Sequence, residues 1–193
     1  MRVFYGIALP QPVREALYEA TVCVRKKTDG QFVTPSSYHC TLAFVGNVEA
    51  DRRTVLENIL KGVADLTPVC NLSLAAPGIF GKPGHSILWH GLTGTESLAT
   101  ASEALRQALR AAKLPYDDKP FRPHITLARE ARMEKCPLFL AQAKPVAWRA
   151  ETLTLFESRR EPAGMVYVPL ASFPMRREES HSDRMDTEKA PGV

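Results

Sequence analysis

The pattern H-x-T-L occurs twice in this chain of 193 residues, as His39-Cys40-Thr41-Leu42 and as His124-Ile125-Thr126-Leu127. Each copy lies in an apolar stretch that is typical of a short β-strand. Side chains at positions i and i+2 of a strand project from the same face, so each copy presents an imidazole beside a hydroxyl while the residue between them points into the core. The repeat therefore predicts two related strands that face one cleft.

Hydrophobic periodicity predicts the same order of elements in both halves of the chain. Helices are expected over residues 13–27, 50–65 and 96–114, with at most a short helix over 138–143. Strands are expected over residues 2–9, 38–45, 69–75, 86–92, 125–128, 148–156 and 165–170. Residues 69–75 would pair with 86–92 across a loosely closed hairpin, and 148–156 with 165–170. The repeated order favours two similar α+β lobes that arose by duplication.

The composition is that of an ordinary soluble globular protein, with 45% apolar and 24% charged residues. No apolar run approaches the ~20 residues of a membrane-spanning helix, and the first ten residues are too short and strand-like for a signal peptide. We therefore expect a cytoplasmic protein that contacts no membrane. Apolar residues become scarce from Arg176 onward, which predicts a single domain over residues 1–175 and a disordered charged tail over 176–193.

The net charge of +4 favours anionic partners only weakly. Four arginines lie near the motifs of the second half, although ordinary solvated arginines explain each of them equally well; these are Arg122, Arg129, Arg159 and Arg160.

Metal and disulfide chemistry find little support in the sequence. The cysteines are far apart and form no C-x-x-C pair, so we expect small buried hydrophobes at Cys23, Cys40, Cys70 and Cys136. Asp117 and Asp118 are paired carboxylates, but with no further metal ligands nearby a solvated turn is the better interpretation.

Two facing H-x-T-L strands would gather two imidazoles and two hydroxyls around one cleft. A phosphate held there could accept hydrogen bonds from both threonines and meet an imidazole on either side. Because imidazole titrates near neutrality, one neutral and one protonated histidine can coexist at pH 7. The pair therefore indicates acid/base catalysis on a phosphate, whereas a single histidine in an apolar strand would more often be a core residue.

Several further segments match a known family. They are the opening Arg2-Val3-Phe4 with Ala8-Leu9-Pro10, the run from Val33 to Val45 that ends in Phe44-Val45-Gly46, the strand Ile87-Leu88-Trp89, and Arg122-Pro123-His124-Ile125-Thr126-Leu127-Ala128-Arg129. Together with the paired motif they resemble the two-histidine phosphoesterases, and within them the RNA 2′,3′-cyclic phosphodiesterases, also called 2′-5′ RNA ligases. The resemblance covers residues 1–173.

The resemblance implies an α+β, bilobal, duplicated fold in which two antiparallel sheets face a central cleft, with the helices on the outside. It implies hydrolysis of the 2′,3′-cyclic phosphate at an RNA end, such as that of tRNA halves, to a 2′-phosphate, with no metal or other cofactor. His39 would be the proton donor to the departing 3′-oxygen and His124 the proton acceptor that activates water. Thr41, Thr126 and Arg129 would bind the phosphate. The near-symmetry of the two motifs leaves the donor and acceptor roles open to exchange.

Other residues receive weaker interpretations. Phe4 is a candidate for stacking on a nucleobase, although a phenylalanine in a first strand is more often part of the core. His85 and His90 are expected at the surface or the cleft rim. Trp89 and Trp148 are expected in the core because of the area that each would bury.

We expect a monomer without an obligate protein partner. Three alternatives for its function remain open. The same site could join a cyclic phosphate to a 5′-hydroxyl through a 2′-5′ bond. The substrate could be a small cyclic nucleotide or ADP-ribose cyclic phosphate. The protein could also bind RNA ends without turnover, although binding alone could use arginine or lysine, whose charge does not depend on pH.

Overall fold

The computed structural model describes residues 1–82, 84–133, 136–162 and 164–177. The strands are β1 (Arg2–Ala8), β2 (Gln31–Phe32), β3 (His39–Asn47), β4 (Cys70–Lys82), β5 (His85–Thr93), β6 (His124–Ala131), β7 (Ala147–Ala150), β8 (Thr152–Glu161) and β9 (Gly164–Pro174). The helices are α1 (Gln11–Arg25), α2 (Arg53–Leu66) and α3 (Glu96–Ala111), and the 3-10 turns are η1 (Pro35–Ser37), η2 (Ala50–Arg52) and η4 (Leu138–Ala141). None of the helices within these ranges is long and apolar enough to cross a membrane.

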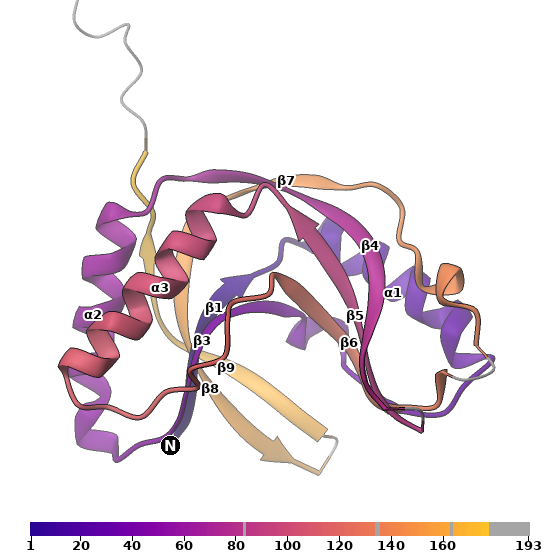
Figure 1. Ribbon diagram of the computed structural model, residues 1–193, viewed down its shortest axis with the longest axis horizontal. Helices are drawn as coiled ribbons and strands as arrows, with labels where there is room; N and C mark the ends of the chain where they lie inside the picture. The colour runs from indigo at the N-terminus through magenta and orange to yellow at the C-terminus, as the bar shows by residue number, and fades with distance from the viewer. Residues whose placement is uncertain (83, 134–135, 163, 178–193) are drawn as a thin grey trace, which may run out of the picture.

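The strands form two lobes that meet at one residue pair, Cys40 of β3 and Ile125 of β6. We call one the β3 lobe, with the strand order β3-β1-β8-β9, and the other the β6 lobe, with the order β7-β4-β5-β6 and with β2 added beside β6. Helices α2 and α3 lie outside the β3 lobe, and α1 lies outside the β6 lobe (Figure 1). The α+β, bilobal prediction is confirmed, and the pair between Cys40 and Ile125 joins the two sheets into one.

The two lobes do not correspond to the two halves of the sequence. The β3 lobe takes its hairpin β8-β9 from the second half, whereas the β6 lobe takes its hairpin β4-β5 from the first half. Strand order depends on contacts between distant segments, and the periodicity of a single segment does not encode them. Each lobe is therefore assembled from both ends of the chain.

Helix α3 ties the outer layer of the β3 lobe to the strand that carries the first motif. Its buried side chains recur at helical spacing, at Leu98, Ala101, Ser102, Leu105 and Leu109. The Ser102 hydroxyl donates a 2.6 Å hydrogen bond to the carbonyl of Leu42 in β3. Burying this hydroxyl is tolerated because it has that partner.

Two strand predictions need correction. The hairpin after residue 75 is not loose, because β4 continues through Pro77 and Gly78 as far as Lys82, which pairs with His85. Pro77 lies at a register shift in the ladder, where a missing amide donor costs little. The single strand expected over residues 148–156 is two strands, of which β7 pairs with β4 and β8 with β9.

The end of the described chain keeps contacts with the core. Met175 is buried, and the amide of Arg176 donates a 2.8 Å hydrogen bond to the carbonyl of Thr67. Residues 178–193, most of the predicted tail, lie outside the described residues. The expectation for the cysteines is met by Cys40 and Cys136, which are buried, but it is wrong for Cys23, which is exposed on α1.

Candidate active site

The pair between Cys40 and Ile125 also sets the geometry of the two motifs. Because β3 and β6 are antiparallel, this register brings Thr41 opposite His124 and His39 opposite Thr126. Burial alternates along both strands, so that Cys40 and Ile125 are buried while the histidines and threonines are partly exposed. The structure thus brings all four polar side chains to one face, with each imidazole across from the other motif's hydroxyl.

Both histidines are oriented by a hydrogen bond from Nδ1 to the backbone carbonyl two residues earlier. Nδ1 of His39 is 2.8 Å from the carbonyl oxygen of Ser37, and Nδ1 of His124 is 2.6 Å from that of Arg122. A carbonyl can only accept, so the proton of a neutral ring lies on Nδ1 in both cases. This leaves Nε2 as the atom that can accept or donate a proton.

Three aromatic rings surround His39. Ring centroids lie 4.5 Å away for Tyr167, 4.7 Å for Phe4 and 6.1 Å for Phe156. Burial lowers the pKa of His39 to about 4, with smaller contributions in the same direction from the charges of Arg129 and His124. The bond to the Ser37 carbonyl acts the other way. In the free protein His39 is therefore neutral at pH 7.

Phe4 is not a free platform for a nucleobase. Its side chain is 2% exposed and stacks on Phe156, with centroids 5.1 Å apart, beside the ring of His39. Stacking on a base would require this cluster to open. Base stacking by Phe4 therefore stays a prediction, and in the structure Phe4 packs beside the histidine ring.

His124 has a more open aromatic environment. The Phe80 ring meets it edge-on at 5.2 Å, and Trp89 lies at 6.3 Å. Burial lowers the pKa of His124, the bond to the Arg122 carbonyl raises it, and the charge of Arg129 lowers it. Trp89 is half-buried and stacks on Phe80, so it lies beside the site and not in the interior, where it was expected. Trp148 is half-buried and packs against the core.

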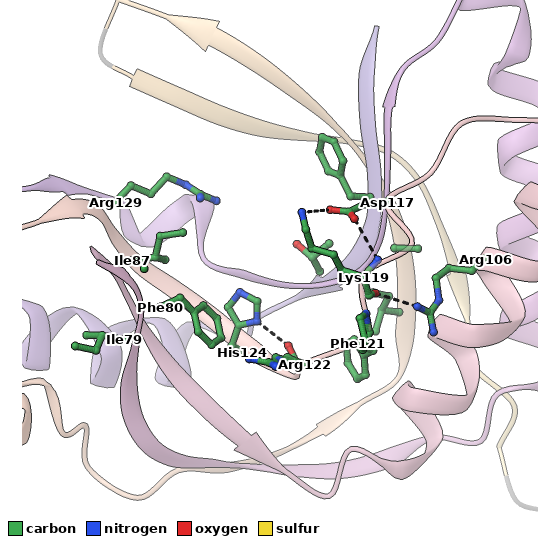
Figure 2. Close-up of a pocket in the computed structure, with 16 residues that line it drawn as sticks. Ile79, Phe80, Ile87, Arg106, Asp117, Lys119, Phe121, Arg122, His124 and Arg129 are labelled. Carbon is green, nitrogen blue, oxygen red and sulfur yellow. Dashed lines mark hydrogen bonds and ion pairs between the residues drawn. The ribbon is translucent and has the colours of Figure 1, made fainter. Parts of the chain in front are cut away.

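A cleft of about 830 Å³ opens on the His124 side of the motifs. Thr41, His124 and Arg129 line it, and Figure 2 shows the Arg129 side chain directed into it. The same guanidinium lowers the pKa of both histidines, so its charge is felt at both. A phosphate bound here would contact the Arg129 guanidinium, the Thr41 hydroxyl and the His124 imidazole.

His39 borders a second, smaller cavity of about 40 Å³, together with Ser37 and Tyr167. Thr126 lines neither cavity, although it is partly exposed across from His39. The two histidines thus lie on either side of the strand junction, with the larger open space beside His124.

Of the other two histidines in the described residues, both expected at the surface or the cleft rim, only one lies there. His85 is exposed and pairs with Glu130 at the hairpin end of the β6 lobe, as predicted for a rim residue. His90 is 0% exposed, so its predicted surface position is wrong. Its Nε2 accepts a 3.3 Å hydrogen bond from the amide of Ala143, which lets a polar ring fill the core beneath the segment after η4.

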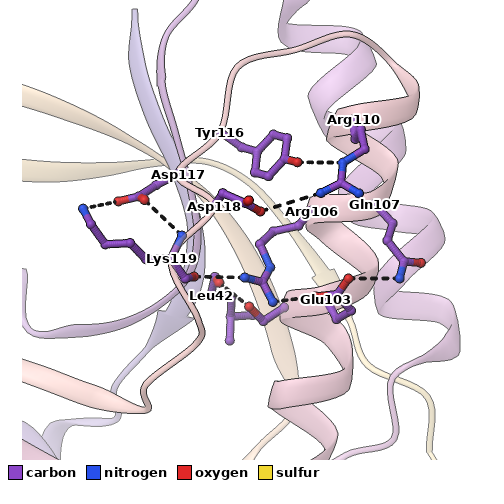
Figure 3. Close-up of polar contacts among 10 residues, drawn as sticks. Leu42, Glu103, Arg106, Gln107, Arg110, Tyr116, Asp117, Asp118 and Lys119 are labelled. Atoms are coloured by element: carbon purple, nitrogen blue, oxygen red, sulfur yellow. Dashed lines mark hydrogen bonds and ion pairs between the residues drawn. The ribbon is translucent and has the colours of Figure 1, made fainter.

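The loop before β6 is braced and not simply solvated. Asp117 accepts hydrogen bonds from the amide and the side chain of Lys119, at 3.1 and 2.9 Å, and Asp118 lies 3.7 Å from Arg110 of α3 (Figure 3). Both carboxylates therefore have cationic partners within the protein. Sequence reasoning missed the cleft-lining side chains of this loop, Lys119 and Phe121; a cation and an aromatic residue just before the second motif were the available signal.

Among the arginines near the second motif, Arg122 and Arg129 line the cleft. Arg159 instead pairs with Glu157 on β8 at 2.6 Å.

Comparison with known proteins gives consistent results. A family model described as the 2′-5′ RNA ligase superfamily matches residues 10–162. The RNA 2′,3′-cyclic phosphodiesterase of Thermus thermophilus is 30% identical over 197 residues, which cover 99% of this chain and 98% of that protein. The protein of the same name from Escherichia coli is 28% identical over 131 residues, covering 67% and 72%.

Solved structures agree with this fold. A Thermus thermophilus crystal structure superposes with a TM-score of 0.77 at 32% identity, covering 92% of this chain and 100% of that one. Escherichia coli LigT complexed with 3′-AMP superposes with a TM-score of 0.72 at 24% identity, covering 90% and 97%.

Proposed function

Because this chain belongs to the 2′-5′ RNA ligase superfamily, we propose that it hydrolyses the 2′,3′-cyclic phosphate at the end of an RNA to a 2′-phosphate. The observation that carries the proposal is the paired geometry of the motifs. Two histidines with Nδ1 fixed by backbone carbonyls lie across the strand junction, each opposite a threonine. We propose that both Nε2 atoms reach a single phosphate bound across the junction.

In the proposed reaction, Nε2 of His124 accepts a proton from a water molecule whose oxygen attacks the phosphorus. The bond from phosphorus to the 3′-oxygen breaks, and that oxygen takes a proton from Nε2 of His39. The products are a 2′-phosphate and a 3′-hydroxyl, and exchange of one proton with solvent restores the two histidines. General acid and base groups of this kind contribute roughly 10²- to 10⁴-fold each.

The lowered pKa values of His39 and His124 in the free protein affect the first step of this cycle. Both histidines are neutral at pH 7 because burial lowers their pKa values. The proton donor must therefore take up a proton as the substrate binds. A phosphate anion beside the ring favours the imidazolium form, so binding itself would raise the pKa of the donor.

Charge on the phosphate would be stabilised by Arg129 and by the hydroxyls of Thr41 and Thr126. A guanidinium makes short, charge-assisted hydrogen bonds to phosphate oxygens, and fixed donors are most effective where charge develops in the transition state. These groups supply the stabilisation that a metal gives in other phosphoesterases, and we propose that the reaction needs no metal. We also propose that the protein acts as a cytoplasmic monomer on RNA ends such as those of tRNA halves.

Ligation is the second candidate function, because the matching family model bears the name of 2′-5′ RNA ligases. A 5′-hydroxyl of a second RNA would take the place of water, with the same proton transfers. The balance between the two reactions would depend on whether a 5′-hydroxyl or water reaches the phosphorus.

The test is incubation of the purified protein, in EDTA, with an RNA that ends in a 2′,3′-cyclic phosphate, and separation of 2′- from 3′-phosphate products. We expect the 2′-phosphate alone, and a loss of at least 100-fold in rate for His39→Ala and for His124→Ala. His85→Ala, which changes an exposed histidine on the rim, is the matched control and should stay within about twofold. A second RNA with a 5′-hydroxyl, added to the same reaction, would reveal any 2′-5′ linkage.

Two results would contradict the proposal. Binding of the RNA without any turnover would favour an end-binding module, and turnover confined to cyclic nucleotides would favour a small-molecule enzyme.

A further inference from the structure

The cleft extends well beyond the residues that the proposed reaction uses. From Thr41 and His124 it continues along β3, past Ala43 and Phe44, to the loop before β6. Its volume of about 830 Å³ lies in the upper part of the ~300–1,000 Å³ range of sites that bind drug-sized ligands. A cyclic phosphate with its ribose would fill only the end next to the histidines.

Both aromatic and cationic side chains line the cleft beyond Thr41. Lys119 and Phe121 come from the loop before β6, while Phe80 lies on the opposite wall, on β4 (Figure 2). The guanidinium of Arg122 lies 5.9 Å from the centroid of the Phe80 ring. Cations beside aromatic faces are the combination with which proteins hold single-stranded nucleic acid, because bases stack on rings and phosphates attract the cations.

Contacts with α3 and β3 hold the loop wall, residues 117–122, in place. Arg106 of α3 donates a 2.9 Å hydrogen bond to the carbonyl of Lys119 (Figure 3), and the amide of Asp117 donates one of 2.8 Å to the carbonyl of Phe44 in β3. Arg110 donates a 2.7 Å bond to the hydroxyl of Tyr116. A wall fixed before the ligand arrives loses little conformational entropy on binding.

We propose that this loop wall, residues 117–122, binds the nucleotide that precedes the cyclic-phosphate end. Lys119 would contact its phosphodiester, and Phe121 would stack on its base. The inference rests on the proposed function and names its substrate class: an oligonucleotide is preferred over a cyclic mononucleotide. Since every base has a face that can stack, the identity of this base should matter little.

The experiment compares kcat/KM for a 2′,3′-cyclic mononucleotide with kcat/KM for a trinucleotide that ends in the same cyclic nucleotide. The wild-type protein should prefer the trinucleotide at least tenfold, because the trinucleotide adds a stacked base and a phosphate contact that the mononucleotide lacks. Lys119→Ala and Phe121→Leu should each reduce this preference at least fivefold. Leucine keeps an apolar side chain where Phe121 packs against the core, so the fold is retained. Lys26→Ala, at an exposed position after α1, is the control for lost charge.

A salt titration provides an independent measure. For the trinucleotide, kcat/KM should fall with rising salt, and a plot of log kcat/KM against log salt gives the slope. Lys119→Ala removes one phosphate contact and should make this slope less steep by about 0.7. Lys26→Ala should leave the slope unchanged. Equal wild-type rates on both substrates would overturn the inference while leaving the hydrolase intact, as would variants that slow both substrates alike. No turnover of either substrate by the wild type would overturn the proposed function and this inference with it.

Discussion

At His39, the side chains that fix the ring also remove it from water. Phe4 and Tyr167 cover it at 4.7 and 4.5 Å, and the Ser37 carbonyl holds Nδ1. Desolvation outweighs this hydrogen bond, and the pKa falls to about 4. The residue is therefore neutral at pH 7 in the free protein, and the proposed mechanism requires an anion beside it to make it an acid.

This pKa makes the stability of the fold depend on pH. The unfolded chain binds a proton at His39 near pH 6.5, whereas the folded chain does so only near pH 4, so the free energy of unfolding falls as pH drops from 6.5 toward 4. At pH 5 the loss from this one group is about 2 kcal/mol relative to pH 7. We expect urea unfolding between pH 7 and pH 5 to show a smaller loss of unfolding free energy for His39→Gln than for the wild type, by about that amount. Equal pH dependence in His39→Gln and wild type would contradict the burial argument.

Tyr167 belongs to β9, the outer strand of the β3 lobe, yet it reaches the ring of His39. Removing it should admit water and raise the pKa of His39 from about 4 toward 6.5. We expect an NMR titration of Tyr167→Ala to show this rise. Tyr18→Ala, on the exposed surface of α1, should leave the His39 titration unchanged. If the His39 titration is also unchanged in Tyr167→Ala, the Tyr167 ring does not control the exposure of His39.

Among the secondary-structure elements, the hairpin β4-β5 supports the other histidine through a close approach of its two strands. A Cβ atom at Gly78 would overlap the ring of Trp89, which in turn stacks on Phe80 beside His124. Gly78→Ala should therefore displace the indole, lower the free energy of unfolding by roughly 1–3 kcal/mol and alter tryptophan emission.

Gly62 provides the matched comparison for this substitution. It lies in the interior of α2, and a Cβ atom at this position would have no neighbouring atom within 4 Å. Gly62→Ala should therefore stabilise the protein by roughly 0.5–1 kcal/mol. Urea unfolding of both variants separates steric overlap from the general effect of replacing a glycine. If both variants raised the free energy of unfolding, the Trp89 indole would have room to move aside.

The helices were predictable because each carries a buried stripe at helical spacing. The stripe of α3, for example, includes Leu98, Leu105 and Leu109, and the helix begins at Glu96 as expected. The pairing of four polar side chains was predictable because the strand period of two is encoded within each motif. His90 was missed because its partner, the amide of Ala143, comes from a segment that no local pattern places above β5. Phe4 was uncertain for the same reason: its neighbours Phe156 and Tyr167 are distant in the sequence.

For the whole molecule, the interleaved lobes were the feature that the repeated order of elements did not predict. Similar halves suggested that each would fold on itself, but the hairpins β4-β5 and β8-β9 join the lobe of the opposite motif. Neither lobe can complete its sheet from a contiguous segment. The fold therefore depends on contacts of large sequence separation, and the two motifs are brought together only when both lobes are formed.

This topology predicts one cooperative unfolding transition. Both tryptophans, Trp89 on β5 and Trp148 on β7, lie in the β6 lobe, whereas α2 and α3 cover the β3 lobe. Leu105→Ala, which empties a fully buried position on α3, should cost roughly 2–5 kcal/mol. If the lobes unfold together, tryptophan fluorescence and far-UV circular dichroism will shift to the same lower midpoint, although the substitution is in the lobe without tryptophan.

Leu66→Ala, at a position 75% exposed at the end of α2, should shift neither signal appreciably. A dichroism midpoint that falls in Leu105→Ala while the fluorescence midpoint stays in place would mean that the β6 lobe survives alone. In that case the junction between Cys40 and Ile125 would be a contact between two independently stable units, and the His39–His124 geometry would depend on their docking.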